Sequence, residues 1–478
     1  MSPGRRVRDA DVVRRSRTPR LDALSALALV IPLVTVAVLA LVRQPPVHDL
    51  TQPPALTELT NATLVCPAPV PTSPVGSLST ASGHAGELSV SADDQKTSIQ
   101  VSTGAVADLP GAGAAVVRGS DDLAPGLLGL RSGTAPLTAQ TCSVPSSEQW
   151  FTGLGSGADH DSVVELVNPD AGRADADITL YGTRPFTVRK LHGITIPGHK
   201  TVTLDLGAIV PRRLLLSAQV QVSRGQLAVH VLDRRTDLAS HKTRTEWLPR
   251  QDAPALDNQL IGLPSGAGTR TLQVANPGDD VVRAQVKIIT GDTSFAPAGV
   301  DPISVAPGAT TALPLTKVLA KAMADGALGV EVTADGPVTA SLLTDLGTDE
   351  AITVPDPVVR EAAATLLPVV APPAPGAPAG KTTTPVSPTL YLAADAAGSA
   401  SVTAYDAAGQ QLLSQRVAQQ QGHTVAVDLP KGTAYLRVVP HGTLVRGSVV
   451  LTGDGATVIP LHELLTRGLV PQISPGLN

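Results

Sequence analysis

The chain has few aromatic side chains: three Phe, two Trp and four Tyr among 478 residues. A surface that stacks on nucleic-acid bases needs such rings, and the same scarcity makes a sugar-stacking platform hard to build. The formal net charge of −5 points the same way, because nucleic-acid-binding domains usually carry a basic face. Nucleic acid is therefore not expected as a partner.

The motifs of common catalytic and cofactor sites are missing as well. There is no Walker A loop, no glycine-rich dinucleotide loop that opens a helix, and no Gly-x-Ser-x-Gly serine elbow. His462-Glu463 begins like a zinc-protease helix, but Thr466 stands where the second metal-binding His would be, so we interpret it as a polar helix end. The sequence predicts no catalytic residue, no cofactor and no metal site.

Two acidic segments are better interpreted as turns than as sites. The segment Asp159–Asp161 holds a His that an acid could orient, but no nucleophile motif accompanies it, which favours a surface turn. Asp170, Asp175 and Asp177 offer three carboxylates, whereas Ca²⁺ takes six to eight oxygen ligands. Neither segment adds a predicted site.

The N-terminus predicts an exported protein with a membrane anchor. Residues 1–20 hold seven Arg and two acidic residues, and residues 23–42 carry no charge. Twenty helical residues span about 30 Å, one bilayer core, and the Arg cluster favours a cytoplasmic N-terminus. The alternative is a secreted chain whose signal peptide is cleaved near Ala40. Both alternatives place the residues after 43 outside the cytoplasm.

The two cysteines of the chain, Cys66 and Cys142, both lie in the part predicted to be exported. Exported compartments permit disulfides, and two cysteines allow a single intramolecular pairing. We therefore expect a Cys66–Cys142 disulfide, with two buried free thiols as the alternative.

The chain also repeats itself, since segments 163–232 and 273–343 can be laid over each other. Two dipeptides recur in the same order and at nearly the same spacing: Asn168-Pro169 with Asn276-Pro277, and Pro197-Gly198 with Pro307-Gly308. Proline removes a ladder donor and so ends a strand, while Pro-Gly suits a type II turn with positive φ at glycine. These residues are predicted to be turn motifs of a duplicated unit.

Alternating apolar and polar residues, with turn signals about every 8–12 residues, are typical of all-β sandwiches. We predict an all-β fold: tandem immunoglobulin-like β-sandwich domains following one N-terminal transmembrane helix, with one short helix at 316–325. The predicted parts are a cytoplasmic Arg-rich tail (1–22), the span (23–42), a Pro-rich linker (43–58), a first, degenerate β domain (59–146), two β-sandwich repeats (147–250 and 251–367), a Pro-rich linker or long loop (368–388) and a divergent repeat (389–478).

Three of the few large rings flank the second repeat: Trp150, Phe151 and Trp247. They are a candidate interaction surface, for example one that stacks on a sugar. The alternative is a structural role, in which the rings seal the join between adjacent sandwiches.

Taken together, these features resemble an actinobacterial family of membrane-anchored exported proteins catalogued as a domain of unknown function. The likeness rests on the Arg-rich tail with its single span, Cys66-Pro67, Cys142 followed by residues 150–153, the two Asn-Pro strands, and the segment 247–250. The resemblance implies a location and an architecture but no activity. A link to envelope glycan assembly is a further, weaker implication.

The function expected from the sequence is that of a non-catalytic extracytoplasmic scaffold or interaction protein of the cell envelope. Its partners would be the membrane, through residues 23–42, and an envelope protein or a cell-wall glycan. The alternatives are a glycan-binding or glycan-assembly accessory protein and, third, a cryptic hydrolase. The sequence leaves the oligomeric state open.

Overall fold

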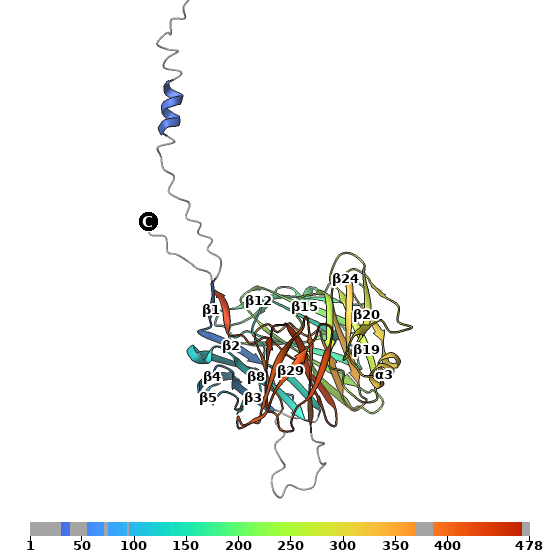
Figure 1. Cartoon of the computed structure of the whole chain (residues 1–478). Coiled ribbons are helices and arrows are strands. Elements are labelled where there is room, and N and C mark those ends of the chain that lie inside the picture. The colour runs from blue at the N-terminus through green and yellow to red at the C-terminus, as the bar shows by residue number, and fades with distance from the viewer. Residues whose placement is uncertain are drawn as a thin grey trace, which may run out of the picture. The chain divides into compact units, whose positions relative to one another are not determined.

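Most of the chain is built from short antiparallel strands, as the alternating pattern predicts (Figure 1). The computed structural model describes residues 30–38, 55–70, 75–92, 95–134, 136–368 and 386–470. Along β12 (Ala174–Tyr181) and β20 (Val282–Thr290), buried and more exposed positions alternate. A period of two buries one face of a strand, and this explains why small aliphatic residues suffice for the cores.

The strands fall into four groups, which we call repeats 1 to 4. Repeat 1 contains β2 (Asn61–Cys66), β3 (Val75–Thr80), β4 (Gly86–Ala92), β5 (Gln95–Val101), β6 (Ala107–Asp108), β7 (Ala115–Ser120), β8 (Leu127–Thr134) and β9 (Leu137–Thr141). Repeat 2 contains β10 (Glu148–Leu154), β11 (His160–Val167), β12, β13 (Ile194–Ile196), β14 (Thr201–Asp205), β15 (Leu216–Arg224), β16 (Ala228–Thr236) and β17 (Thr243–Leu248).

Repeats 3 and 4 follow the same plan. Repeat 3 contains β18 (Ala255–Ile261), β19 (Thr269–Asn276), β20, β21 (Ser294–Phe295), β22 (Ile303–Val305), β23 (Ala309–Pro314), β24 (Ala327–Asp345) and β25 (Glu350–Thr353). Repeat 4 contains β26 (Ala363–Leu366), β27 (Ser387–Ala394), β28 (Gly398–Tyr405), β29 (Gln411–Gln419), β30 (Thr424–Asp428), β31 (Tyr435–His441), β32 (Val445–Thr452) and β33 (Ala456–Pro460). The strands β1 (Ala55–Glu58) and β34 (Arg467–Val470) pair with each other.

All four repeats share one strand order. In repeat 2 the two sheets run β10-β15-β12-β13 and β14-β11-β16-β17, and repeats 1 and 4 reproduce this order strand for strand. In repeat 3 the long strand β24 serves both sheets, so it takes the places of β15 and β16 together. In each repeat the two sheets contribute side chains to a common apolar cluster. The same strand order thus recurs in the regions predicted as a first, degenerate domain and a divergent last repeat, as well as in the two segments where the sequence repeats most clearly.

The helices are short and peripheral. The helix expected at 316–325 is α3 (Thr316–Ala324), and Gly326 follows it at a φ of 91°, a conformation that suits glycine. The other helical segments in the described part of residues 57–468 are α2 (Leu206–Ile209) and the 3₁₀ turns η1 (Asp121–Leu123) and η2 (Arg189–Leu191).

The Pro-rich segment 368–388 proves to connect two strands of one repeat. The strand β26 precedes it and pairs with β31, well inside repeat 4. The last repeat thus begins one strand earlier than the predicted start at 389. The sequence missed β26 because its four residues, AATL, carry no alternation.

The buried amides of Asn168 and Asn276 explain why the two dipeptides recur together. The Asn168 side chain donates to the carbonyls of Gly172, Ile196 and Pro197 and accepts from the Asp170 amide. The Asn276 side chain makes the same set of bonds, to Asp280, Val305, Ala306 and Gly278. Each Asn therefore ties its own turn to the later Pro-Gly turn of its repeat.

The two Pro-Gly turns need glycine for different reasons. Gly308 has a φ of 60°, as the type II turn requires. In the other turn the positive φ falls instead on His199, at 56°. There Gly198 is needed for space, because a Cβ would lie 2.0 Å from the Ala171 carbonyl oxygen.

Replacing Asn168 with Ala should lower the free energy of unfolding by roughly 2–4 kcal/mol, because this buried side chain makes four hydrogen bonds, of which the one to the Ile196 carbonyl is fully buried. Asn276→Ala should cost a similar amount, and urea denaturation measures both. Asn61→Ala is the control, since the Asn61 side chain is exposed and, among the described residues, hydrogen-bonds only to its neighbour Thr60. Equal stability of Asn168→Ala and Asn61→Ala would contradict this account.

Residues 57–468 form one compact unit in which the four repeats close into a ring. The last strand of each repeat contacts its counterpart in the next: β9 contacts β17, β17 contacts β25, β25 contacts β33, and β33 contacts β9. In Figure 1 the blue strands of repeat 1 lie beside the red strands of repeat 4. We call β9, β17, β25 and β33 the central strands.

Repeat 4 also shares apolar core with repeat 1. Leu130, Leu137 and Ala139 of repeat 1 belong to the cluster formed by repeat 4. The Val106 amide donates to the Ala407 carbonyl at 3.0 Å. The join between the last and first repeats is thus a packed interface.

The strands on the outside of the ring include unpaired edges. Within the described residues, β5 and β29 each end a sheet and have a neighbour on one side only. The first six residues of β29, Gln411–Arg416, are exposed or half-buried. Unpaired backbone groups along an edge can accept another strand.

The predicted span lies mostly outside the described residues. Residues 30–38 are helical, while 1–29 and 39–54, which hold the Arg-rich tail and the first linker, are not among those described. No helix in the described part of the chain is both long and apolar enough to cross a membrane.

Candidate functional site

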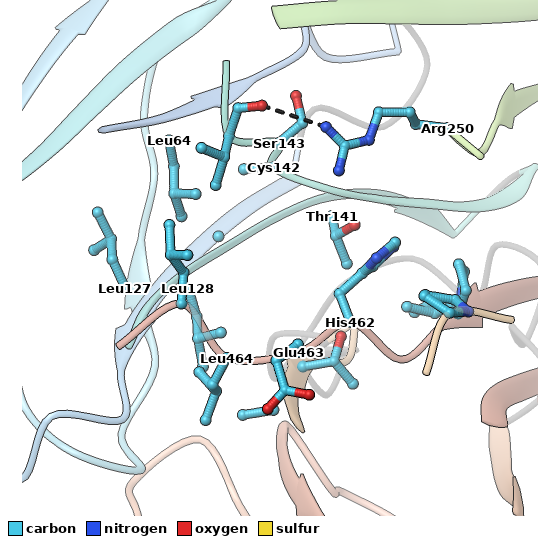
Figure 2. A pocket seen from close by; sticks show the side chains of 18 of the residues that line it. Leu64, Leu127, Leu128, Thr141, Cys142, Ser143, Arg250, His462, Glu463 and Leu464 are labelled. Carbon is cyan, nitrogen blue, oxygen red and sulfur yellow. Dashed lines mark hydrogen bonds between the residues drawn. The ribbon is translucent and has the colours of Figure 1, made fainter. Parts of the chain in front are cut away.

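A cavity of about 460 Å³ opens between repeats 1 and 4 (Figure 2). Its walls come from β2, β8 and β9 of repeat 1, from β26 and β33 of repeat 4, and from the connections 249–252 and 357–360. Small-molecule sites in proteins commonly fall in this size range. The ring closure creates the cavity, because its two main walls are far apart in the sequence.

One side of the cavity is apolar. Figure 2 shows Leu64, Leu127, Leu128 and Leu464 gathered there. The disulfide lies against the same wall: Cys66 and Cys142 are bonded, as predicted, and Cys142 lines the cavity. The disulfide fixes this wall by joining β2 to the segment that follows β9.

The other side carries the charge of Arg250. This residue follows β17 and Pro249, and its Nη1 atom lies 3.5 Å from the Val144 carbonyl oxygen. Burial lowers the pKa of Arg250, and Asp252 opposes that shift, but a guanidinium stays protonated in proteins. Among the residues described, no carboxylate lies within ion-pair distance of it.

His462 lies between the two sides in Figure 2. Burial and the nearby Arg250 lower its pKa to about 4, so the imidazole is neutral at neutral pH. The Glu463 carboxylate is already engaged, because it accepts hydrogen bonds from the backbone amides of residues 360–362. His462 and Glu463 lie in an irregular segment after β33, which corrects the predicted helix end.

A serine, a histidine and a carboxylate meet near the cavity in a way the sequence did not show. Ser143 Oγ lies 3.1 Å from His230 Nε2, and His230 Nδ1 lies 3.3 Å from Glu165 Oε2. This is the order of a hydrolase triad. However, His230 is 2% exposed and is not among the lining residues, and the Ser143 amide already donates to Val65.

An amide bonded in this way cannot stabilise an oxyanion, as the nucleophile's own amide does in many hydrolases. Glu165 also accepts from the Ala68 amide of repeat 1. We therefore interpret the arrangement as a polar join between repeats 1 and 2.

Buried carboxyl groups surround the central strands. Thr138 of β9 donates to Glu246 of β17, and burial raises the pKa of Glu246 well above its usual value. Burial also raises the pKa of Asp349 to about 7. Asp349 packs against the turn before β33, where a Cβ on Gly455 would lie 1.6 Å from its carboxylate. These groups come from different repeats.

The neighbouring acids Glu350 and Asp233 compete for one cation. Arg235 Nε lies 2.9 Å from Glu350 and 3.4 Å from Asp233. Burial would raise the pKa of Asp233, but His160, Arg235 and Ser162 lower it. Burial and the Asp233 charge raise the pKa of Glu350 to about 8, against the opposing effect of Arg235.

His160 corrects another sequence interpretation. It lies in β11, is 3% exposed and bonds to Asp233 at 2.9 Å, so its part of the segment Asp159–Asp161 is buried and not a surface turn. The partner, Asp233, is 73 residues away in the sequence, which is why the pattern did not reveal it.

The candidate interaction surface formed by Trp150, Phe151 and Trp247 is not exposed. Their side chains are 4%, 1% and 4% exposed. Phe151 belongs to the core of repeat 2, and Trp150 stacks on Tyr181 with ring centroids 5.8 Å apart.

The three acids considered for Ca²⁺ are divided among separate contacts. Asp175 accepts from Thr195, Asp177 accepts from the Gly193 amide, and Asp170 is exposed. Within the described ranges, no group of three or more His, Cys, Asp or Glu residues is arranged to hold a metal ion.

A family model described as a family of unknown function, DUF5719, matches residues 90–430. The chain belongs to this family. The match covers most of the repeats and includes Arg250, whereas His462 and Leu464 follow it. A search of curated protein sequences finds no match to the chain. Family membership therefore supports the unknown-function part of the resemblance noted above and assigns no activity.

Sequence reasoning missed Arg250 as a functional candidate, although it stands in the segment 247–250. A single Arg after a strand and a proline carries no recognisable signal. Its importance depends on the cavity wall that repeat 4 supplies.

Proposed function

We propose that this chain is a non-catalytic extracytoplasmic interaction protein of the cell envelope, built from four immunoglobulin-like β-sandwiches. The observation that carries the proposal is the closed ring with the unpaired edge of β29 on its outside. A packed ring presents fixed surfaces, and an exposed edge can bind an extended segment of a partner through backbone hydrogen bonds.

The disulfide supports the proposed location. Disulfides persist in oxidising compartments and are rare in the cytosol, so the Cys66–Cys142 bond indicates an extracytoplasmic chain. Anchoring through residues 23–42, with the N-terminus in the cytoplasm, is part of the same proposal and rests on the charge pattern alone.

A photo-crosslinking residue at Leu412 tests the role of β29. Leu412 is exposed on that edge, and Arg437 is a suitable control because it is exposed on β31, an inner strand of the same sheet. In native membranes, Leu412 should give an adduct of defined mass and Arg437 should not. Adducts at both positions, or at neither, would contradict docking at this edge.

Glycan binding has less support than protein docking. The rings best suited to stack on a sugar are buried. The hydrolase alternative rests on Ser143, whose amide is already bonded to Val65.

A further inference from the structure

We infer that the cavity between repeats 1 and 4 binds an amphiphile with one anionic head group and a single apolar chain. The inference goes beyond the proposed docking function, because it concerns a small ligand at a different place on the ring. It rests on three observations: a guanidinium without an ion-pair partner among the described residues, an apolar wall facing it, and the His462 side chain between them.

The head group is assigned by Arg250. Its guanidinium lines the cavity and, among the described residues, makes one hydrogen bond, a long one of 3.5 Å to the Val144 carbonyl oxygen. A guanidinium offers five N–H donors in a fixed plane, a geometry that matches carboxylate and phosphate oxygens. Arg360, exposed at the rim, adds a second positive charge. A cationic ligand would be repelled.

The charges that could repel an anion are few. Glu463 is engaged by three backbone amides, and His462 is neutral. Asp252 is the remaining carboxylate of the lining, and it is exposed. The environment around Arg250 is thus partly buried and favours a single negative charge.

The chain of the ligand is assigned by the leucine wall. Leu64, Leu127, Leu128 and Leu464 face a cavity whose volume of about 460 Å³ is not filled by side chains. Burying a methylene group is favourable by about 0.8 kcal/mol, so an apolar tail that packs against this wall would stabilise the complex. An inorganic anion would leave it uncovered.

Photolabelling can test the inference on the full-length chain in lipid nanodiscs. The probe is a twelve-carbon carboxylate bearing a diazirine, and mass spectrometry locates its adducts. We expect adducts in the peptides that contain Leu128 and Leu464. Laurate should compete with the probe, whereas dodecanol and sulfate should not. Competition by dodecanol as strong as by laurate would overturn the head-group assignment, and competition by sulfate would overturn the chain assignment.

Variants give opposite expected effects, which separates binding from folding. Arg250→Gln should weaken laurate competition at least about tenfold, since it removes a charge-assisted contact. Asp252→Asn should strengthen it, and Arg437→Gln, outside the cavity, should leave it unchanged. Leu128→Phe should reduce labelling by filling the cavity. No labelling of the lining, or identical affinity of the Arg250 and Arg437 variants, would show the inference to be wrong.

Discussion

Removing the Cys66–Cys142 disulfide is expected to lower the free energy of unfolding by about 3–4.5 kcal/mol. The bond links residues 76 apart. In the chain-entropy model, loops of 15 and 100 residues give about 3 and 4.7 kcal/mol, and strain reduces the gain. Both half-cystines are buried, so the folded chain without the disulfide would gain few new contacts with solvent to offset this loss of stability.

Urea denaturation with and without a thiol reductant measures this effect. The reductant should lower the midpoint for the natural chain and leave a Cys66→Ala/Cys142→Ala variant unchanged. Alanine is the better replacement, because a buried serine would add an unpaired hydroxyl. Glycine at position 129 leaves room for the disulfide, because a Cβ there would lie 2.6 Å from Cys142 Sγ. A reductant-insensitive midpoint in the natural chain would contradict the prediction.

Raising the pH from 6.5 to 9 should destabilise the protein by at least about 2–3 kcal/mol. The cause is the pair Asp349 and Glu350, whose pKa values are raised to about 7 and about 8. Each unit of pKa difference corresponds to 1.36 kcal/mol. Over this pH range the folded state keeps protons that the unfolded carboxyls have already released. Stability therefore falls as the pH rises through the folded-state pKa values.

The pH range from 6.5 to 9 largely avoids the opposing effect of His462 on stability. Its pKa of about 4 in the folded state lies below its ordinary value, so the stability it contributes is lost as the pH falls from about 6.5 to 4. Between pH 6.5 and about 7.5 the unfolded histidine releases its remaining proton, which offsets only about 0.4 kcal/mol of the loss, and above that range it is neutral in both states. Glu246 and Asp356, whose pKa values are raised well above the usual range by burial, act in the same direction as Glu350.

Glu350→Gln should flatten the dependence of stability on pH between 7 and 9. Glutamine keeps the shape of a protonated glutamate but cannot ionise. Exposed Glu361→Gln is the matched control and should leave the slope unchanged. Denaturation midpoints at several pH values give the comparison. The same slope in the natural chain and in Glu350→Gln would show that Glu350 is ionised in the folded state.

The sequence predicted those features that depend on local patterns. Alternation predicted the strands, and the Asn-Pro and Pro-Gly dipeptides marked turns that the structure ties together through the Asn168 and Asn276 side chains. The count of two cysteines predicted the disulfide. These features can be predicted because each depends on a few residues near one another in the sequence, or on a single allowed pairing.

Features that depend on the closed ring were not visible in the sequence. The cavity needs Leu128 of repeat 1 and Leu464 of repeat 4 on facing walls. Glu350 meets Arg235 of the preceding repeat. The burial of Trp150 and Trp247 follows from packing inside and between repeats, which composition cannot specify. Long-range closure decides each of these outcomes.

The meeting of repeats 1 and 4 also bears on how the polypeptide could be reconnected. The Leu59 amide donates to the Thr466 carbonyl at 3.1 Å, so the compact unit is entered and left at neighbouring points. A circular permutant that joins these points and opens between β26 and β27 would keep every sheet of the four repeats and every interface of the ring. The order of the repeats along the polypeptide is therefore set by the gene, whereas in the folded ring each repeat has two neighbouring repeats.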